Sequence, residues 1–287
     1  MVARWPWAWL AVGAAAGVLQ AFSIAWPWGG QPLWWLQWLS LAALTAVLPG
    51  RSPRTAFLLA WTFATAWLTA TFWWLFISMH TYGGLAAWMA ALAVLALAAF
   101  LSLYYAVAAA LFARFARGRA TFDALLFAAL WLMAELLRDS LFTGFPWGAG
   151  GYAHVDGPMA VLAPWLGVYG IGAVAAAIAF LIGQLAQAGA RRSWPYWLGV
   201  VALGGLLAAC NAVATAPSND AARAPVSVAL LQGNIPQDEK FQGGSGIPLA
   251  LEWYGRTMLG ANAAFVVAPE TALPLLPRAK PSRSWSR

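Results

Sequence analysis

The sequence has very few charged residues. Asp, Glu, Lys and Arg make up 9% of its 287 residues, while hydrophobic residues make up 62%. A soluble globular domain carries about 25% charged residues. So little charge excludes a soluble protein of this length, because its surface could not be covered with polar side chains. The composition therefore predicts a membrane protein and argues against a nucleic-acid partner.

Cysteine is also scarce. The single cysteine, Cys210, lies in the apolar stretch GGLLAACNAVATA, which excludes an intrachain disulfide and disfavours a cysteine-based metal site. A thiol in apolar surroundings stays protonated and inert, so we expect no catalytic role for Cys210. His154 and Asp156 lie together on the predicted outer side but are too few to hold a metal. We therefore expect no metal and no cofactor.

Seven apolar stretches approach the length of about 20 residues that a helix needs to cross a bilayer. They are apolar on all sides, whereas a helix at the surface of a soluble core has one apolar stripe. The first stretch also resembles a signal peptide, but the equally apolar stretches after it favour an uncleaved span. Together they predict a membrane domain over residues 1–212, with spans at 7–24, 33–48, 56–79, 85–112, 122–137, 160–188 and 194–212.

Arginine is distributed unevenly between the two sets of loops. If the N-terminus is cytoplasmic, the loops on that side carry Arg4, Arg51, Arg54, Arg114, Arg117, Arg119, Arg191 and Arg192. The opposite loops before the last span carry only Arg138. Because positive charge stays on the cytoplasmic side, the N-terminus is expected there, in a bacterial inner membrane. Seven spans then place the residues after 212 in the periplasm.

The composition changes after residue 212. Residues 213–225 form a polar linker that contains proline. VSVALLQGNIP and AFVVAPE each contain an apolar, β-branched run typical of a buried strand, and a segment with helical spacing lies between them. A strand, a helix and a second strand predict the start of an α/β domain over residues 226–276. Residues 277–287 form an aberrant basic tail.

Polar residues follow both predicted strands. Gln232 and Asn234 follow the first strand, and Glu270 follows the second. The carboxyl ends of parallel strands meet at one edge of a sheet, so these side chains should lie close together. A carboxylate that is partly desolvated there suits general-base catalysis. The alternatives are a Glu270 that makes only local hydrogen bonds and a simple turn at Gln232–Asn234.

The segment between the fifth and sixth spans, residues 143–170, is rich in glycine and proline. Irregular backbone at membrane depth is tolerated only where protein buries it or where it lines a cavity. Just before it, Glu135 and Arg138 are three residues apart, and we expect them to pair at the helix end. Few charges lie within the spans, which argues against a transporter.

Four motifs, in this order, resemble those of bacterial apolipoprotein N-acyltransferases. They are WLFISMHTYGG (74–84), TGFPWGAGGYAHVDGPMAVLAPWLGVYG (143–170), VALLQGNIPQDEKF (228–241) and VVAPETALP (266–274). The resemblance implies a helical membrane bundle that carries a nitrilase-like α/β sandwich on its periplasmic side. It also implies transfer of a fatty acyl chain from a glycerophospholipid to the diacylglyceryl-cysteine of a lipoprotein, through a Cys thioester.

The resemblance assigns roles to individual residues. Glu270 matches the general base of a Glu–Lys–Cys triad, and Phe241 matches a position in a loop near the active site. Phe145, Pro146 and Trp147 match the membrane mouth through which acyl chains reach the site. The implied partners are a phospholipid donor, a diacylglyceryl-modified apolipoprotein acceptor and the membrane itself.

The sequence departs from the family pattern after Glu270. In the family the Lys and the Cys follow the glutamate at a distance, and a final membrane helix comes after them. Lys280 lies in a tail unlike that continuation, so no role is transferred to it. We therefore expect a truncated member that is inactive by itself; the alternative is a non-catalytic membrane remnant or lipid-binding platform.

Overall fold

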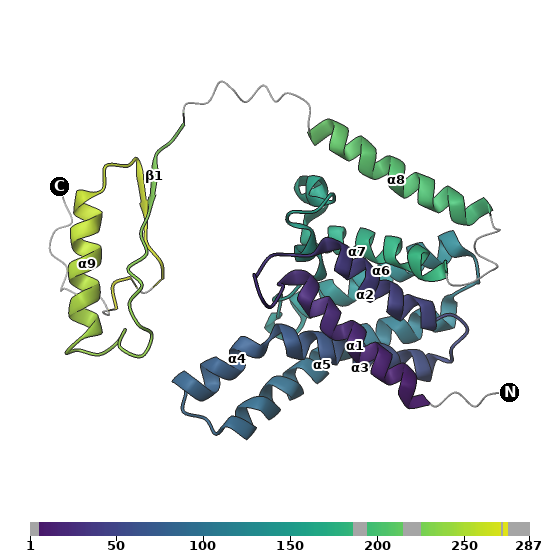
Figure 1. Ribbon diagram of the computed structural model, residues 1–287, viewed down its shortest axis with the longest axis horizontal. Coiled ribbons are helices and arrows are strands. Elements are labelled where there is room, and N and C mark those ends of the chain that lie inside the picture. The colour runs from purple at the N-terminus through teal and green to yellow at the C-terminus, as the bar shows by residue number, and fades with distance from the viewer. Residues whose placement is uncertain (1–5, 186–193, 215–224, 271, 275–287) are drawn as a thin grey trace. The chain divides into compact units, whose positions relative to one another are not determined.

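The computed structural model describes residues 6–185, 194–214, 225–270 and 272–274. The chain divides into two compact units, Met1–Ala216 and Pro217–Arg287. We call them the helical unit and the α/β unit, and each is described by itself (Figure 1). Most of the linker expected at 213–225, and the whole tail expected at 277–287, lie outside the described residues.

The helical unit contains eight α-helices in its described part, and brief turns of 3-10 or π-helix lie between some of them. The α-helices are α1 (Pro6–Ile24), α2 (Trp34–Val47), α3 (Pro53–Thr71), α4 (Trp73–Ile77), α5 (Ala87–Phe115), α6 (Ala120–Ser140), α7 (Ala163–Gln184) and α8 (Trp194–Ala214). The π-helical turn is η1 (Ser78–Tyr82), and the 3-10 turns are η2 (Leu141–Thr143), η3 (Gly150–His154) and η4 (Ala160–Leu162).

A helix occupies most of the described part of each of the seven stretches that the sequence predicts to span a membrane. Among the described residues, the segments Ala87–Phe115, Ala120–Thr143 and Ala160–Gln184 are long and apolar enough to cross a bilayer. A fourth candidate is the bent pair Pro53–Thr71 and Trp73–Tyr82, while α1 and α2 are apolar but shorter. A helical bundle suited to a membrane is therefore supported, and the number of seven crossing helices stays a prediction.

The third expected span, residues 56–79, is not one straight helix. The chain bends by 53° between α3 and α4, at Phe72. The hydroxyl of Thr71 donates to the carbonyl of Trp67 at 2.9 Å, a contact that bends helices, and the side chain of Phe72 is fully buried. The bend places α4 beside the first part of α5, where the two helices project from the rest of the helical unit (Figure 1).

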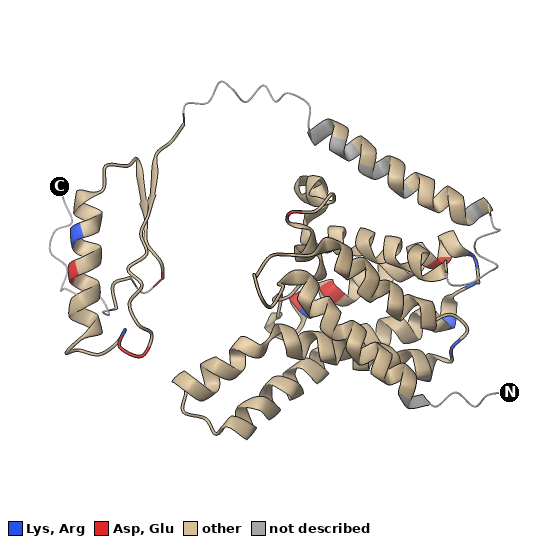
Figure 2. Cartoon of the chain, in the orientation of Figure 1, with Lys and Arg blue, Asp and Glu red and all other residues tan. Residues whose placement is uncertain are grey.

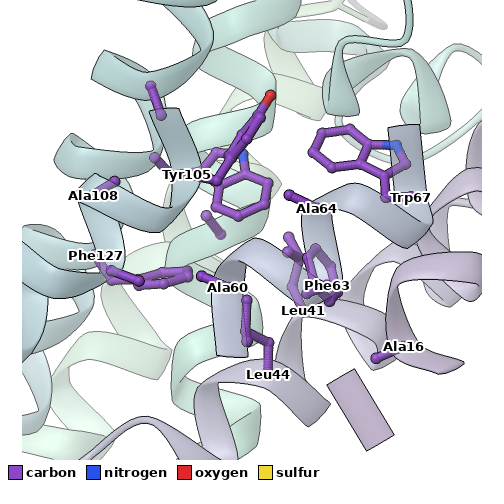
Figure 3. Close-up of a cluster of buried hydrophobic side chains, with 14 of the residues drawn as sticks. Ala16, Leu41, Leu44, Ala60, Phe63, Ala64, Trp67, Tyr105, Ala108 and Phe127 are labelled. Carbon is purple, nitrogen blue, oxygen red and sulfur yellow. The ribbon is translucent and has the colours of Figure 1, made fainter. Parts of the chain in front are cut away.

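Aromatic rings fill the centre of the helical unit. Phe63, Trp67, Tyr105 and Phe127 form one cluster, and small alanines lie between them (Figure 3). The indole of Trp67 stacks on that of Trp131, with centroids 5.8 Å apart and planes at 13°. Since lipid tails are as apolar as these side chains, close van der Waals packing is what favours helix association here.

Two helices of the bundle touch backbone to backbone at Gly17. A Cβ atom added to Gly17 of α1 would lie 2.1 Å from the carbonyl oxygen of Phe63 on α3, whereas one added to Gly13 would lie 3.5 Å from that of Leu59. Only the first distance is a clash. Small residues at such crossings let membrane helices approach closely.

Gly17→Ala is therefore expected to destabilise the bundle by about 1–3 kcal/mol, because the added methyl forces α1 away from α3. Gly13→Ala is the matched control, since its methyl makes an ordinary contact. The measurement is the unfolding transition of each variant in detergent micelles. Equal stability of the two variants would contradict the close crossing at Gly17.

Basic residues gather at one end of the helical unit (Figure 2). Arg51 and Arg54 lie around the connection from α2 to α3, and Arg114, Arg117 and Arg119 around that from α5 to α6. The remaining arginines of the predicted cytoplasmic loops, near the N-terminus and between α7 and α8, lie outside the described residues. The described part of the bundle therefore has one basic end.

The α/β unit contains β1 (Val228–Leu230), α9 (Gly246–Gly260) and β2 (Phe265–Val267) in its described part. The two strands pair in parallel, with Val228 opposite Phe265 and Leu230 opposite Val267. This confirms the predicted strand, helix and parallel strand, but the prediction that the strands are buried is wrong, since only Ala229 of their six residues is even partly buried. The buried residues of α9 include Ala250 and Tyr254, which pack with Ala272. Two strands form one small sheet, so a sandwich of two sheets stays a prediction.

Candidate functional site

A cavity of about 480 Å³ lies at the carboxyl edge of the two strands. We call it the strand-edge cavity. Its walls come from the end of β1 and the turn after it, from α9, and from the end of β2. The lining residues are Leu230, Leu231, Gln232, Asn234, Ile235, Lys240, Ala250, Tyr254, Val267, Ala268 and Pro269. Gln232 and Asn234 thus lie at the edge where Glu270 follows Pro269, as their positions after parallel strands predict.

Glu270 is exposed in the structure and does not itself line the cavity. The expectation that its carboxylate is partly desolvated is therefore wrong for this unit. All three residues of β2 are exposed too, because no described residue of the α/β unit covers this part of the strand. The side chain follows Pro269, a residue of the cavity wall, and its catalytic role remains a proposal.

Two polar residues of this cavity, Tyr254 and Lys240, were not predicted from the sequence. Tyr254 of α9 accepts a hydrogen bond from the backbone N–H of Gly233 at 3.0 Å, which fixes the turn between Gln232 and Asn234. Lys240 is half-buried and brings a positive charge to the wall of the cavity that Gln232 and Asn234 also line. Its neighbour Phe241 is 59% exposed and does not line the cavity.

A second candidate site lies in the helical unit, in the loop of residues 141–149, which we call the aromatic loop. Its backbone is irregular, as the glycine and proline content predicts: Phe142 and Thr143 have φ of 53° and 72°. A Cβ atom at Gly144 would lie 1.7 Å from the carbonyl oxygen of Asp139, and one at Gly148 would lie 2.6 Å from Cγ2 of Thr71. The loop is therefore pressed against both α6 and α3.

The aromatic loop places Phe145, Pro146 and Trp147 beside the bend after α3. The ring of Phe145 packs edge-on against Phe72, with centroids 4.9 Å apart. Trp147 lies 5.2 Å from Phe145 and 6.3 Å from Trp74 of α4. Pro146 is exposed and Trp147 is 55% exposed. The first two sequence motifs, although distant along the chain, thus meet at one exposed aromatic surface.

Two buried charges of α6 hold this segment. Arg138 donates from Nη1 to the carbonyls of Phe145 and, at 2.8 Å, Trp147, and from Nε to the hydroxyl of Tyr105 at 3.1 Å. Glu135 accepts the backbone N–H of Gly150 at 3.0 Å. The predicted Glu135–Arg138 ion pair is wrong, since these side chains do not approach within 4.0 Å. The irregular loop has backbone groups that need partners, and each charge satisfies some of them.

His154 is buried rather than available to a metal. Its Nε2 lies 2.7 Å from Oε1 of Gln37, whose Nε2 donates to the carbonyl of Gly150 at 2.7 Å. Burial lowers the pKa of His154 to about 4, so the ring is neutral at pH 7. Asp156 is exposed. Within the described residues, no group of three or more His, Cys, Asp or Glu side chains could hold a metal ion.

The neutral ring makes stability depend on pH. Unfolded, His154 takes up a proton near pH 6.5, but folded it does so only near pH 4. The unfolded state therefore binds more protons between these values, and stability falls as the pH drops from about 6.5 to 4. We expect a loss of up to about 3 kcal/mol, measured by unfolding at a series of pH values. His154→Gln should remove this part of the pH dependence. If the stability of the variant falls as steeply between pH 6.5 and 4 as that of the parent, His154 is not the cause.

Gln20, Gln37 and Tyr105 are further buried polar residues that the sequence analysis missed. A signal for them exists, because each interrupts an apolar stretch predicted to lie in the membrane. Polar side chains in such stretches usually face the interior of a bundle. What the sequence did not supply was the partners of Gln37, which come from η3, and the partner of Tyr105, which comes from α6.

Comparison with known proteins bears directly on these two sites. The family model described as "Apolipoprotein N-acyltransferase N-terminal domain" matches residues 16–181, more than half of the chain. The chain belongs to the apolipoprotein N-acyltransferase family. The matched region contains the aromatic loop together with Glu135 and Arg138.

Curated relatives extend the likeness beyond the helical unit. The apolipoprotein N-acyltransferase of Verminephrobacter eiseniae is 56% identical over 286 residues, which cover 95% of this chain and 52% of that protein. That of Ralstonia nicotianae is 47% identical over 85% of this chain and 46% of its own length. That of Pseudomonas putida is 37% identical over 95% and 53%. The chain thus spans about half the length of these relatives.

Proposed function

We propose that this chain supplies the membrane unit and part of the active site of an enzyme that transfers a fatty acyl chain. The donor is a glycerophospholipid, and the acceptor is the α-amine of a diacylglyceryl-cysteine lipoprotein. The observation that carries the proposal is the strand-edge cavity, in which Gln232, Asn234 and the residue before Glu270 meet in a member of this family. Glu270, the proposed base, is the next residue along the sequence.

The proposed chemistry is ping-pong acyl transfer. Glu270 takes the proton of a cysteine thiol and the thiolate attacks the phospholipid ester, forming the thioester. The bond to the glycerol oxygen breaks, and that oxygen takes the proton from Glu270 as the lysophospholipid leaves. The acceptor amine then attacks the thioester and releases the thiol. The lysine of the triad stabilises the oxyanion at both steps. In the family pattern this lysine and this cysteine follow the glutamate at a distance. Cys210 precedes Glu270, and Lys280 lies close after it in a tail unlike the family's continuation, so neither takes these roles.

The other site residues have proposed roles in binding. Phe145, Pro146 and Trp147 form the surface over which acyl chains leave the bilayer, since indole and phenyl rings suit the boundary between lipid and water. Gln232 and Asn234 hydrogen-bond the polar part of the donor, and Phe241 contacts substrate from the loop beside them. The ammonium of Lys240 in the cavity wall suits the phosphate of a glycerophospholipid.

The proposed setting is a bacterial inner membrane that the chain crosses several times. The arginines at one end of the helical unit support a cytoplasmic position for that end. The N-terminus is then cytoplasmic and the α/β unit periplasmic, where both lipid substrates are found. The parallel strands of that unit support a nitrilase-like domain as the rest of its fold.

The test is an acyl-transfer assay on the protein purified at the length it has in the membranes of its source. It is incubated with phosphatidylethanolamine vesicles that carry a labelled acyl chain and with a diacylglyceryl-cysteine peptide. We expect label on the peptide amine and a labelled thioester intermediate. The 287-residue chain alone, whose one cysteine is Cys210, is expected to form no thioester. Absence of label at natural length would overturn the proposal.

The second candidate function is lipid binding without catalysis. It is favoured by a groove of about 300 Å³ with an almost wholly apolar wall, between α2, α7 and α8. Its lining residues are Trp38, Ile178, Leu181, Ile182, Leu185, Tyr196, Trp197, Val200 and Gly204. Saturable binding of labelled phospholipid, with no label on the peptide amine at natural length, would select this function over the first.

A further inference from the structure

Glu135 and Arg138 are wholly buried, although both are charged residues in an apolar helix. A charge inside a membrane segment is costly, so such residues are rare and usually have a function. They do not pair with each other, and the proposed acyl transfer uses neither of them chemically. Neither an ion pair nor the proposed chemistry therefore explains why these two charges are buried.

The two side chains hold opposite ends of one short stretch of chain. They are three residues apart on α6 and so lie on the same face of the helix. The guanidinium of Arg138 binds carbonyls at the first part of the stretch, those of Phe145 and Trp147. The carboxylate of Glu135 binds the N–H at its end, that of Gly150. Each charge thus meets the backbone group of opposite polarity.

Neighbouring contacts leave this arrangement little freedom. Tyr105 fixes the guanidinium by accepting from its Nε, and the N–H of Phe145 returns a bond to the carbonyl of Arg138 at 2.9 Å. A Cβ atom at Gly150 would lie 2.6 Å from Nε2 of Gln37 and 3.3 Å from Oε1 of Glu135. An added methyl would therefore displace the amide of Gln37 and crowd the carboxylate of Glu135.

We propose that Arg138 and Glu135 are positioning residues that hold residues 145–150 in one conformation. That conformation keeps Phe145 against Phe72 and Trp147 next to Trp74. The irregular stretch has no regular secondary structure to fix it, so its conformation depends on the hydrogen bonds that the two charges make with its backbone. The consequence for lipid access rests on the proposed function, whereas the consequence for loop order does not.

Loop order is tested on the 287-residue chain in phospholipid nanodiscs. A nitroxide is attached at Pro146→Cys, an exposed position of the stretch, after Cys210→Ser removes the native thiol. Arg138→Met is expected to raise the ratio of mobile to immobile nitroxide at least about tenfold, because two hydrogen bonds to a charged donor are lost. Arg138→Lys, which still donates to carbonyls, should restore most of the order.

Matched variants separate positioning from folding. Arg114→Met makes the same change at an exposed arginine of α5 and should leave the spectrum unchanged. A nitroxide at Leu125, exposed on α6, should stay equally mobile in all variants if the bundle is folded. Glu135→Gln keeps an oxygen that accepts the N–H of Gly150 and should resemble the parent, whereas Glu135→Leu should resemble Arg138→Met.

Two results would overturn the proposal. One is an unchanged spectrum at position 146 in both Arg138→Met and Glu135→Leu. The other is a rise in nitroxide mobility at both position 125 and position 146, even in Arg138→Lys and Glu135→Gln. The two charges would then be required for the whole bundle to fold.

Lipid access is tested separately at natural length, where Arg138→Met is expected to raise the KM for phospholipid at least about tenfold with a smaller change in kcat. If the parent enzyme transfers no acyl groups, the proposed function fails while the nitroxide spectra still decide the positioning. If transfer is normal in Arg138→Met although the loop is mobile, the role in lipid access is overturned and the proposed function stands.

Discussion

Glu270→Gln is expected to lower acyl transfer by about 10²–10⁴-fold in the enzyme at natural length, which is the range for a lost general base. Glutamine has the size and shape of glutamate but does not take the proton of a thiol. The first half-reaction should therefore fail. The measurement is the rate of thioester formation from labelled phosphatidylethanolamine, followed by the rate of label transfer to the peptide amine.

The matched control is Glu252→Gln. Glu252 is an exposed carboxylate of the same α/β unit, on α9, where it pairs with Arg256 at 2.6 Å and lies outside the strand-edge cavity. An exposed pair of this kind contributes little, so activity and stability should stay close to the parent. If both variants lose activity equally, or if Glu270→Gln keeps full activity, Glu270 is not the base.

Trp67→Ala is expected to destabilise the helical unit by about 3–5 kcal/mol, the range for removal of a large buried aromatic side chain. Trp67 is 0% exposed and touches three other rings of the core cluster. Its indole stacks on Trp131 and lies 5.1 Å from Tyr105, whose hydroxyl in turn accepts from Arg138. The measurement is the free energy of unfolding in mixed micelles, with near-ultraviolet dichroism to follow aromatic packing.

Trp73→Ala is the control for this change. It removes the same side chain from α4, where Trp73 is 61% exposed and no buried cluster depends on it. Its loss should cost little stability in the helical unit. Equal destabilisation by the two variants would show that the central aromatic cluster has no special share in the stability of the bundle.

Much of the architecture could be predicted from local sequence. The low charge and the apolar stretches locate the helices, because burial in lipid depends on the composition of each segment by itself. The β-branched runs before Gln232 and before Glu270 predict the strands, and the helical spacing between them predicts α9. A strand, a helix and a strand in this order make a parallel pair, which the pairing of Val228 with Phe265 confirms.

The candidate site could be predicted only in part. The order of the strands sufficed to place Gln232 and Asn234 at the edge where β2 ends, whereas Glu270, predicted there with them, does not line the cavity. The position of Lys240 in the same cavity depends on how the chain returns towards α9, which no local pattern describes. The exposure of Glu270 likewise depends on what packs over β2. Burial is a property of the neighbours of a residue rather than of the residue itself.

The sequence by itself determined the class of the protein, the places of its helices and strands, and the motifs of its family. The tertiary structure decided the bend at Phe72, the burial of His154, and the partners of Glu135 and Arg138. Spacing along α6 suggested that these two charges pair with each other, since they share a face of the helix. The folded chain brings the backbone of residues 145–150 to that face, and buried charges take the polar groups that lie nearest in space.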